Sequence, residues 1–224
     1  SLDSDGFTVG TGTETNTNTE NFVSWNWKAA GATTVTNDDG TIDSEVTANA
    51  TAGYSIASYT GNGTSGATIG HGLSVTPQMV IIKRYDTAAS WIVYSERVGA
   101  GAALMLDVSS AKYVYAQYFN NTVPTASVIS LGNNNDVNGN TYTYISYSFH
   151  SVAGYSQIGY YTGNGLADGP IIYTGFQPAW VLKKSINADA NWHITDNARN
   201  PYNVMDLILA PNDTLSDQGS WNMD

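Results

Sequence analysis

An internal repeat constrains the fold of this chain more than any other feature of its sequence. Two stretches share four landmarks in the same order: Gly-Tyr-Ser, Tyr-Thr-Gly-Asn-Gly, a proline before an apolar run that ends in lysine, and a tryptophan. The landmarks begin at Gly53, Tyr59, Pro77 and Trp91, and again at Gly154, Tyr161, Pro178 and Trp192. In both copies proline follows glycine by 24 residues and tryptophan follows proline by 14, at an overall offset of 101 residues (154 − 53). The Tyr-Thr-Gly-Asn-Gly strings differ by 102 (161 − 59), because the second copy holds one extra residue before its string. Four landmarks in the same order, with the offset restored after this residue, predict that one β-rich unit occurs twice.

A second similarity links the beginning of the chain to the end of the first copy. Residues 23–27 (Val-Ser-Trp-Asn-Trp) resemble residues 145–149 (Ile-Ser-Tyr-Ser-Phe), and residues 7–10 resemble 129–132, both at an offset of 122 (145 − 23). The predicted organisation is therefore closing strands of a preceding unit at 1–28, a connector at 29–52, a complete unit at 53–152, and an incomplete copy at 153–224. A sheet without its closing strands leaves backbone groups unpaired along an edge.

Two explanations of the incomplete copy stay open. The chain is either clipped from a longer protein, or residues 1–28 supply the missing strands. In the second case they complete the chain's own second unit or that of a neighbouring copy, as in strand addition.

Short runs of β-favouring residues separated by turn signals indicate the fold class. Val23, Trp25 and Trp27 alternate with polar residues, and residues 80–82 are Val-Ile-Ile. Such runs are typical of strands. Asn-Gly or Asp-Gly pairs, which favour tight turns, occur at 39–40, 62–63, 138–139 and 164–165. The chain is predicted to be all-β, with tandem units like a β-sandwich or jelly roll.

Charge and composition exclude several classes of function. The net charge is −11 with only 8 Lys and Arg residues, whereas binding to nucleic acid needs a basic surface against the phosphates. There is no cysteine, so disulfides and thiolate metal sites are excluded. No apolar run approaches the roughly 18 residues of a membrane span, so no membrane insertion is expected. A surface rich in Thr, Ser and Asn but only 12% charged is typical of secreted adhesins and virion proteins, which favours a virion or extracellular location.

Candidate binding residues each have a structural alternative. The string Tyr-Thr-Gly-Asn-Gly at 59–63 and 161–165 suits a sugar-contacting loop, but it suits a hairpin turn better because Asn and Gly accept positive φ. The six tryptophans are candidates for stacking on sugar rings and stand at 25, 27, 91, 180, 192 and 221. Trp91, Trp180 and Trp192 lie at repeat or strand positions, where packing in the core is the better explanation. Trp221 is left unassigned.

No cofactor or metal site is expected. Asn134, Asp136, Asn138 and Gly139 imitate the start of a calcium loop, but Ile145 stands where the bidentate glutamate is needed. The three histidines, at 71, 150 and 193, have no mutual spacing suited to zinc.

The sequence does not predict an enzyme. It contains no Gly-x-Ser-x-Gly, phosphate-loop or dinucleotide-loop motif. Glu96 is the best candidate acid for glycan hydrolysis, with Asp107 or Asp196 as partner, but nothing in their spacing selects them. We therefore assign no catalytic residues.

A family resemblance follows from longer strings. They stand at Tyr59–Gly63, Gly70–Leu73, Pro77–Lys83, Trp91–Tyr94, Tyr173–Ala179, Ala198–Asn203 and Asp5–Val9. Together they resemble a repeat of virion structural or appendage proteins of tailed phages, which is associated with concanavalin-like jelly rolls, and the resemblance covers nearly all of the chain. It implies a tail-fibre-like, appendage or decoration protein and brings no catalytic residues.

The sequence is consistent with two main functions. The first is a non-enzymatic virion structural or appendage protein that takes part in assembly and host attachment, with copies of itself or other virion proteins as partners. The alternative is an extracellular carbohydrate-binding module with a host glycan as ligand; a glycan-degrading enzyme is less favoured.

Overall fold

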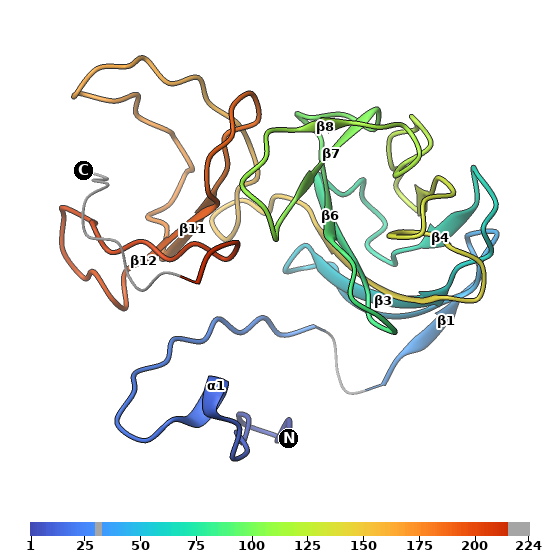
Figure 1. The fold of residues 1–224 in the computed structure, drawn as a ribbon, viewed down its shortest axis with the longest axis horizontal. Coiled ribbons are helices and arrows are strands. Elements are labelled where there is room, and N and C mark those ends of the chain that lie inside the picture. The colour runs from blue at the N-terminus through green and yellow to red at the C-terminus, as the bar shows by residue number, and fades with distance from the viewer. Residues whose placement is uncertain (30–32, 215–224) are drawn as a thin grey trace.

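The computed structural model describes residues 1–29 and 33–214, and this part of the chain is all-β, as predicted. It contains one four-residue helix, α1 (Thr13–Asn16), and twelve strands (Figure 1). The strands are β1 (Val35–Asn37), β2 (Ser44–Asn49), β3 (Tyr54–Thr60), β4 (Thr68–Gly70), β5 (Met79–Arg84), β6 (Trp91–Ser95), β7 (Ala102–Met105), β8 (Tyr113–Val114), β9 (Val128–Ser130), β10 (Thr143–Phe149), β11 (Trp180–Lys183) and β12 (His193–Asp196). No helix in these residues is long and apolar enough to cross a membrane.

Eight strands form one antiparallel sheet in the order β1-β2-β3-β10-β5-β6-β7-β8. β10 lies between β3 and β5, although it follows them by many residues in the sequence, and it pairs with both over most of its length. The last strand of the first repeat (residues 53–152) therefore joins β3 to β5 in the middle of the sheet.

Alternation along β10 decides which face of this sheet carries the core. Tyr144, Ser146 and Ser148 are buried, whereas Ile145 and Tyr147 on the opposite face are only half-buried. The small sheet of β4 and β9, in which Ile69 pairs with Ile129, covers the buried face. Its side chains join those of the large sheet in one apolar cluster, which gives the first repeat two packed layers like a β-sandwich.

The other face of the large sheet, called here the outer face, is also largely apolar. Strand register and alternation place on it the following residues: Ile56 and Ser58 of β3, Ile145 and Tyr147 of β10, Ile81 and Lys83 of β5, Trp91 and Val93 of β6, and Leu104 of β7. The hairpin β11–β12 packs on one part of this face, where Val93, Leu104 and Trp192 are buried together. In Figure 1 this hairpin lies beside the large sheet.

The hairpins β5–β6 and β11–β12 have the same register. Met79 pairs with Ser95 and Ile81 with Val93 in the first hairpin, while Trp180 pairs with Asp196 and Leu182 with Ile194 in the second. Every one of these positions differs by 101 (180 − 79). The two copies of the sequence repeat therefore form hairpins with the same strand pairing.

The rest of the second repeat (from residue 153) differs from the first. Between β10 and β11 the only β pairing is the isolated bridge of Val152 with Ser156, so β3 and β4 have no counterpart there. The expected connector at 29–52 is more than a linker, because β1 and β2 extend the large sheet. Residues 1–28, expected to be closing strands, form α1 and the isolated bridge of Leu2 with Phe7, but no strand.

Candidate functional site

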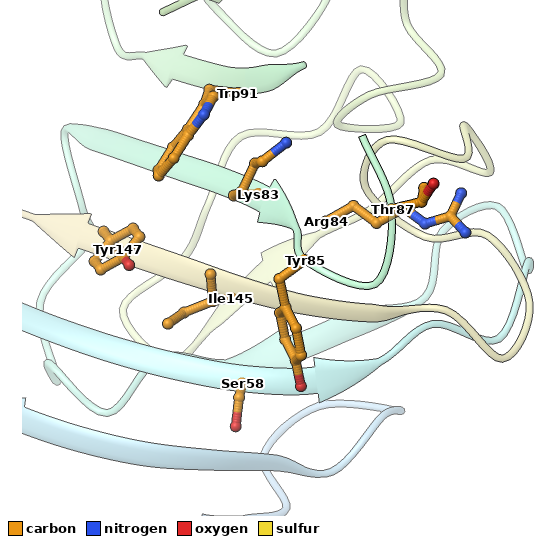
Figure 2. Close-up of a pocket in the computed structure, with 8 residues that line it drawn as sticks. All are labelled: Ser58, Lys83, Arg84, Tyr85, Thr87, Trp91, Ile145 and Tyr147. Carbon is orange, nitrogen blue, oxygen red and sulfur yellow. The ribbon is translucent and has the colours of Figure 1, made fainter. Parts of the chain in front are cut away.

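An open groove of about 610 Å³ lies on the part of the outer face that the second hairpin leaves uncovered (Figure 2). Four strands and the loop after β5 contribute to it. Its lining residues are Ser58, Lys83, Arg84, Tyr85, Thr87, Trp91, Ile145 and Tyr147.

The floor of the groove is apolar and aromatic. The rings of Trp91 and Tyr147 are nearly parallel, with centroids 6.5 Å apart and an interplanar angle of 20°. Figure 2 shows Ile145 beside Tyr147 on the same strand, two residues apart and hence on the same face. A tyrosine hydroxyl is a protonated donor at neutral pH, and burial raises the pKa of Tyr147 further.

The rim is polar and carries one cation over the floor. The Lys83 ammonium lies 5.7 Å from the centroid of the Trp91 ring and donates to the backbone oxygen of Ala89. Arg84 points away from the groove in Figure 2, with its guanidinium 3.3 Å from the centroid of Tyr142. Tyr85 stands at the rim and is 59% exposed.

This arrangement offers groups that can bind a ligand. Flat aromatic faces next to hydroxyls and an ammonium match the apolar face and the hydroxyl edge of a sugar ring. The lining residues include no carboxylate, and glycoside hydrolysis uses a pair of them.

The carboxylates considered from the sequence do not meet. Glu96 is exposed just after the end of β6, where it accepts a hydrogen bond from the Gln78 amide at 3.1 Å. Asp107 lies at the other end of β6 and accepts from the Trp91 backbone N–H at 3.1 Å. Asp196 is buried in β12 and forms an ion pair with Arg199 at 2.8 Å.

The Asn138 side chain is a structural hub. It is fully buried, and its amide nitrogen donates to the backbone oxygens of Thr64 and Gly132, both at 2.9 Å. Its oxygen accepts from the Asn62 backbone N–H at 2.9 Å. In the same loop the Asn134 side-chain oxygen accepts from the backbone N–H of Asp136 at 2.7 Å. The side-chain oxygens of Asn134 and Asn138, two of the residues that imitate calcium ligands, thus already accept hydrogen bonds.

The histidines lie in separate places. His71 is buried between the backbone N–H of Leu73, 3.3 Å from Nδ1, and the carbonyl of Thr125, 3.2 Å from Nε2. His193 lies in β12, and His150 follows β10. Within residues 1–29 and 33–214, no three potential His, Asp or Glu ligands cluster around a common point.

The two Tyr-Thr-Gly-Asn-Gly strings occupy different environments. Tyr59 is buried in β3, and its hydroxyl donates to the Val137 carbonyl at 2.6 Å, whereas Tyr161 is exposed in a loop. Gly63 and Gly165 have φ of +70° and +69°, values that glycine accepts readily. The expected hairpin is wrong at the first string, because β3 pairs with β2 and β10 and not with β4, the next strand along the chain. In the first repeat this string is therefore structural.

The tryptophans divide between the core and the groove. Trp192 is 4% exposed, but Trp91, at the equivalent position, is only half-buried and lines the groove. Trp180 contacts the rings of Trp25 and Trp27. Trp221 lies outside the described residues.

Trp91 was expected to pack in the core, but it is only half-buried and lines the groove, because the second hairpin leaves its part of the outer face uncovered. The other groove residues were not predicted from the sequence. The sequence does contain a pattern that could have indicated Tyr147 and Ile145, because β10 has apolar residues on both faces. Ser58, Lys83 and Tyr85 join them only through strand pairing that is distant in the sequence.

Comparison with known proteins identifies a family but no activity. No curated protein and no solved structure shows significant similarity to this chain. The sequence profile of DUF7483, described as a domain of unknown function, matches residues 1–224. Since this match spans the whole sequence, the chain belongs to the DUF7483 family.

Proposed function

We propose that the chain is a non-enzymatic structural protein of a virion or extracellular appendage, which associates through the faces of its β-sheets. The observation that carries this proposal is the packing of like faces: Ile81 and Leu182 hold equivalent positions in the two repeats and lie in one apolar cluster. A face that accepts its own repeat suits a protein that builds by stacking similar units.

Polar contacts support the same proposal. The backbone N–H of Lys112 donates to the carbonyl of Ile186 at 3.1 Å, and that of Ala190 donates to the carbonyl of Ser109 at 2.8 Å. The Asp189 carboxylate accepts from the backbone N–H of Ala111 at 2.8 Å. The contact between the repeats is thus hydrogen-bonded as well as apolar, as in a built interface. The resemblance to phage appendage repeats points to a virion as the assembly.

Self-association of the purified protein tests this proposal. Sedimentation velocity over a wide concentration range and negative-stain imaging are expected to show oligomers or fibres of defined shape. A protein that stays monomeric at every concentration and forms no regular assembly contradicts it.

Glycan attachment at the groove is a second candidate function, favoured by the Trp91–Tyr147 platform under Lys83. A glycan array is expected to give binding that Tyr85→Ala weakens several-fold, because Tyr85 stands at the rim and is largely exposed. Tyr173→Ala is the matched control, since Tyr173 is 89% exposed and does not line the groove. Equal loss in both variants, or binding that neither affects, contradicts a glycan site at this groove.

A further inference from the structure

The edge of β11 that faces away from β12 pairs with no strand within the described residues. In the first repeat the equivalent edge, that of β5, is occupied by β10. β5–β6 and β11–β12 share one register, so the second hairpin offers the same backbone donors and acceptors that β10 satisfies in the first. An unpaired edge of this kind is a template for one more strand.

The sequence similarity indicates which segment can pair with this edge of β11. Residues 23–27 match 145–149 of β10. In the first repeat Phe149 lies opposite Met79, and Tyr147 opposite Ile81. The same register in the second repeat places Trp27 opposite Trp180 and Trp25 opposite Leu182.

Ring contacts agree with this register. The centroids of Trp27 and Trp180 are 5.4 Å apart, and those of Trp25 and Trp180 are 6.4 Å apart, both edge-to-face. The nearer ring is the one that the register puts directly opposite Trp180, and the farther ring is its diagonal neighbour. Trp27 and Trp180 are therefore in contact at the position that the repeat predicts, although they are far apart in the sequence.

Two further observations point to the same place. The side-chain amide of Asn49, at the end of β2, donates to the carbonyl of Lys28 at 3.0 Å, which fixes one end of the segment. The indole N–H groups of Trp25 and Trp180 are both buried without a hydrogen-bond partner, although buried indoles normally have one. The segment thus contacts β11 through its tryptophan rings, although β11 pairs only with β12.

We propose that residues 22–28 are the third strand of the second sheet, antiparallel to β11 and contributed by the same chain. This inference does not rest on a virion or glycan-binding role. It makes the N-terminal segment a structural part of the second repeat. It also places Val23, Trp25 and Trp27 on the side of that sheet where Trp180 and Leu182 face the first repeat.

An engineered disulfide tests the strand and its register. The proposed pairing puts Asn26 opposite Val181, and Cα atoms of opposed residues in antiparallel strands lie about 4.5–5.5 Å apart, within reach of a disulfide. The chain has no cysteine of its own, so Asn26→Cys with Val181→Cys gives a single pair. The control pair is Asn18→Cys with Val181→Cys, eight residues along the segment and out of register.

The expected result is rapid disulfide formation within the monomer for the first pair and little for the control, read by mass spectrometry of non-reduced peptides. Equal cross-linking of both pairs, or of neither, overturns the proposal. Cross-linking of the first pair between two copies also overturns it, because the strand then comes from another molecule.

Hydrogen exchange of the unmodified chain tests the same strand without any substitution, in case the cysteine variants fold poorly. Alternate amides of residues 23–27 are expected to exchange at least tenfold more slowly than those of residues 17–20, because one edge of the strand is hydrogen-bonded. Exchange at the same rate in both segments contradicts the strand.

Discussion

The indole N–H of Trp192 donates to the backbone carbonyl of Met105 at 2.8 Å, which joins the second repeat to the outer face of the first. The same ring packs with Val93 and Leu104 in a cluster that both repeats share. Its counterpart Trp91 lies half-exposed in the groove. One repeat position therefore has two roles, which depend on what covers the outer face.

Trp192→Ala is expected to lower the free energy of unfolding by about 3–5 kcal/mol, as for other large buried aromatic residues. Chemical denaturation measures this, with Trp91→Ala as the control at the equivalent position. The control should lose clearly less, because Trp91 is only half-buried. A larger loss for Trp91 than for Trp192 is inconsistent with the packing described.

Asn138→Asp is expected to destabilise the protein by about 2–4 kcal/mol, because it removes the donors to Thr64 and Gly132 and adds a buried charge. Asn164→Asp, in an exposed turn of the second repeat, should change stability by less than about 0.5 kcal/mol. Thermal unfolding of both variants compares them. Similar melting temperatures for the two would show that the amide network does not hold the loop.

Chelation of metal ions is expected to leave the melting temperature unchanged. The Asn134 and Asn138 oxygens already accept backbone N–H groups, so they are not free to hold Ca²⁺. Scanning calorimetry with and without EDTA checks this. A drop of several degrees that added Ca²⁺ reverses would restore the calcium site that the sequence imitates.

Stability is expected to fall as the pH drops below about 6.5, in part because of His71. Burial holds the pKa of His71 below its usual value of 6.5, although the Thr125 carbonyl and the Asp39 charge oppose this. Between the folded and the unfolded pKa the unfolded chain binds more protons, so acid favours unfolding.

Denaturation of the wild type and of His71→Gln at pH 7.5 and pH 5.5 isolates this effect. The variant should lose less stability between the two pH values. An equal loss in both proteins would assign the pH dependence to other groups.

The sequence predicted best those features that local pattern and repetition control. The register shared by β5–β6 and β11–β12 agrees with the equal spacing, in both repeats, between a proline, a run that ends in lysine and a tryptophan. β1 and β2 were harder to predict, because residues 33–49 are rich in Thr and Asp. Burial of two apolar residues holds this region in the fold: Val46 in β2, and Ile42 just before β2, which forms a bridge with Ile69 of β4.

The second repeat shows the limit of reasoning from similarity. Residues 154–165 repeat the sequence of 53–63 but form no strand, because a strand needs partners on its edges. β3 has β2 and β10 as neighbours, and no described segment stands in either place beside 154–165. The groove could not be predicted from the sequence either, because Ser58, Lys83 and Tyr147 come together only through the pairing of β3, β10 and β5.

The most direct test of the proposed structural role is to locate the protein in its native assembly. Immunogold electron microscopy of purified particles, with antibody raised against this chain, is expected to label an appendage or the particle surface at regular positions. Mass spectrometry of the same particles should recover its peptides in stoichiometric amounts. Particles that carry neither label nor peptides, together with a purified protein that stays monomeric, would contradict the structural role.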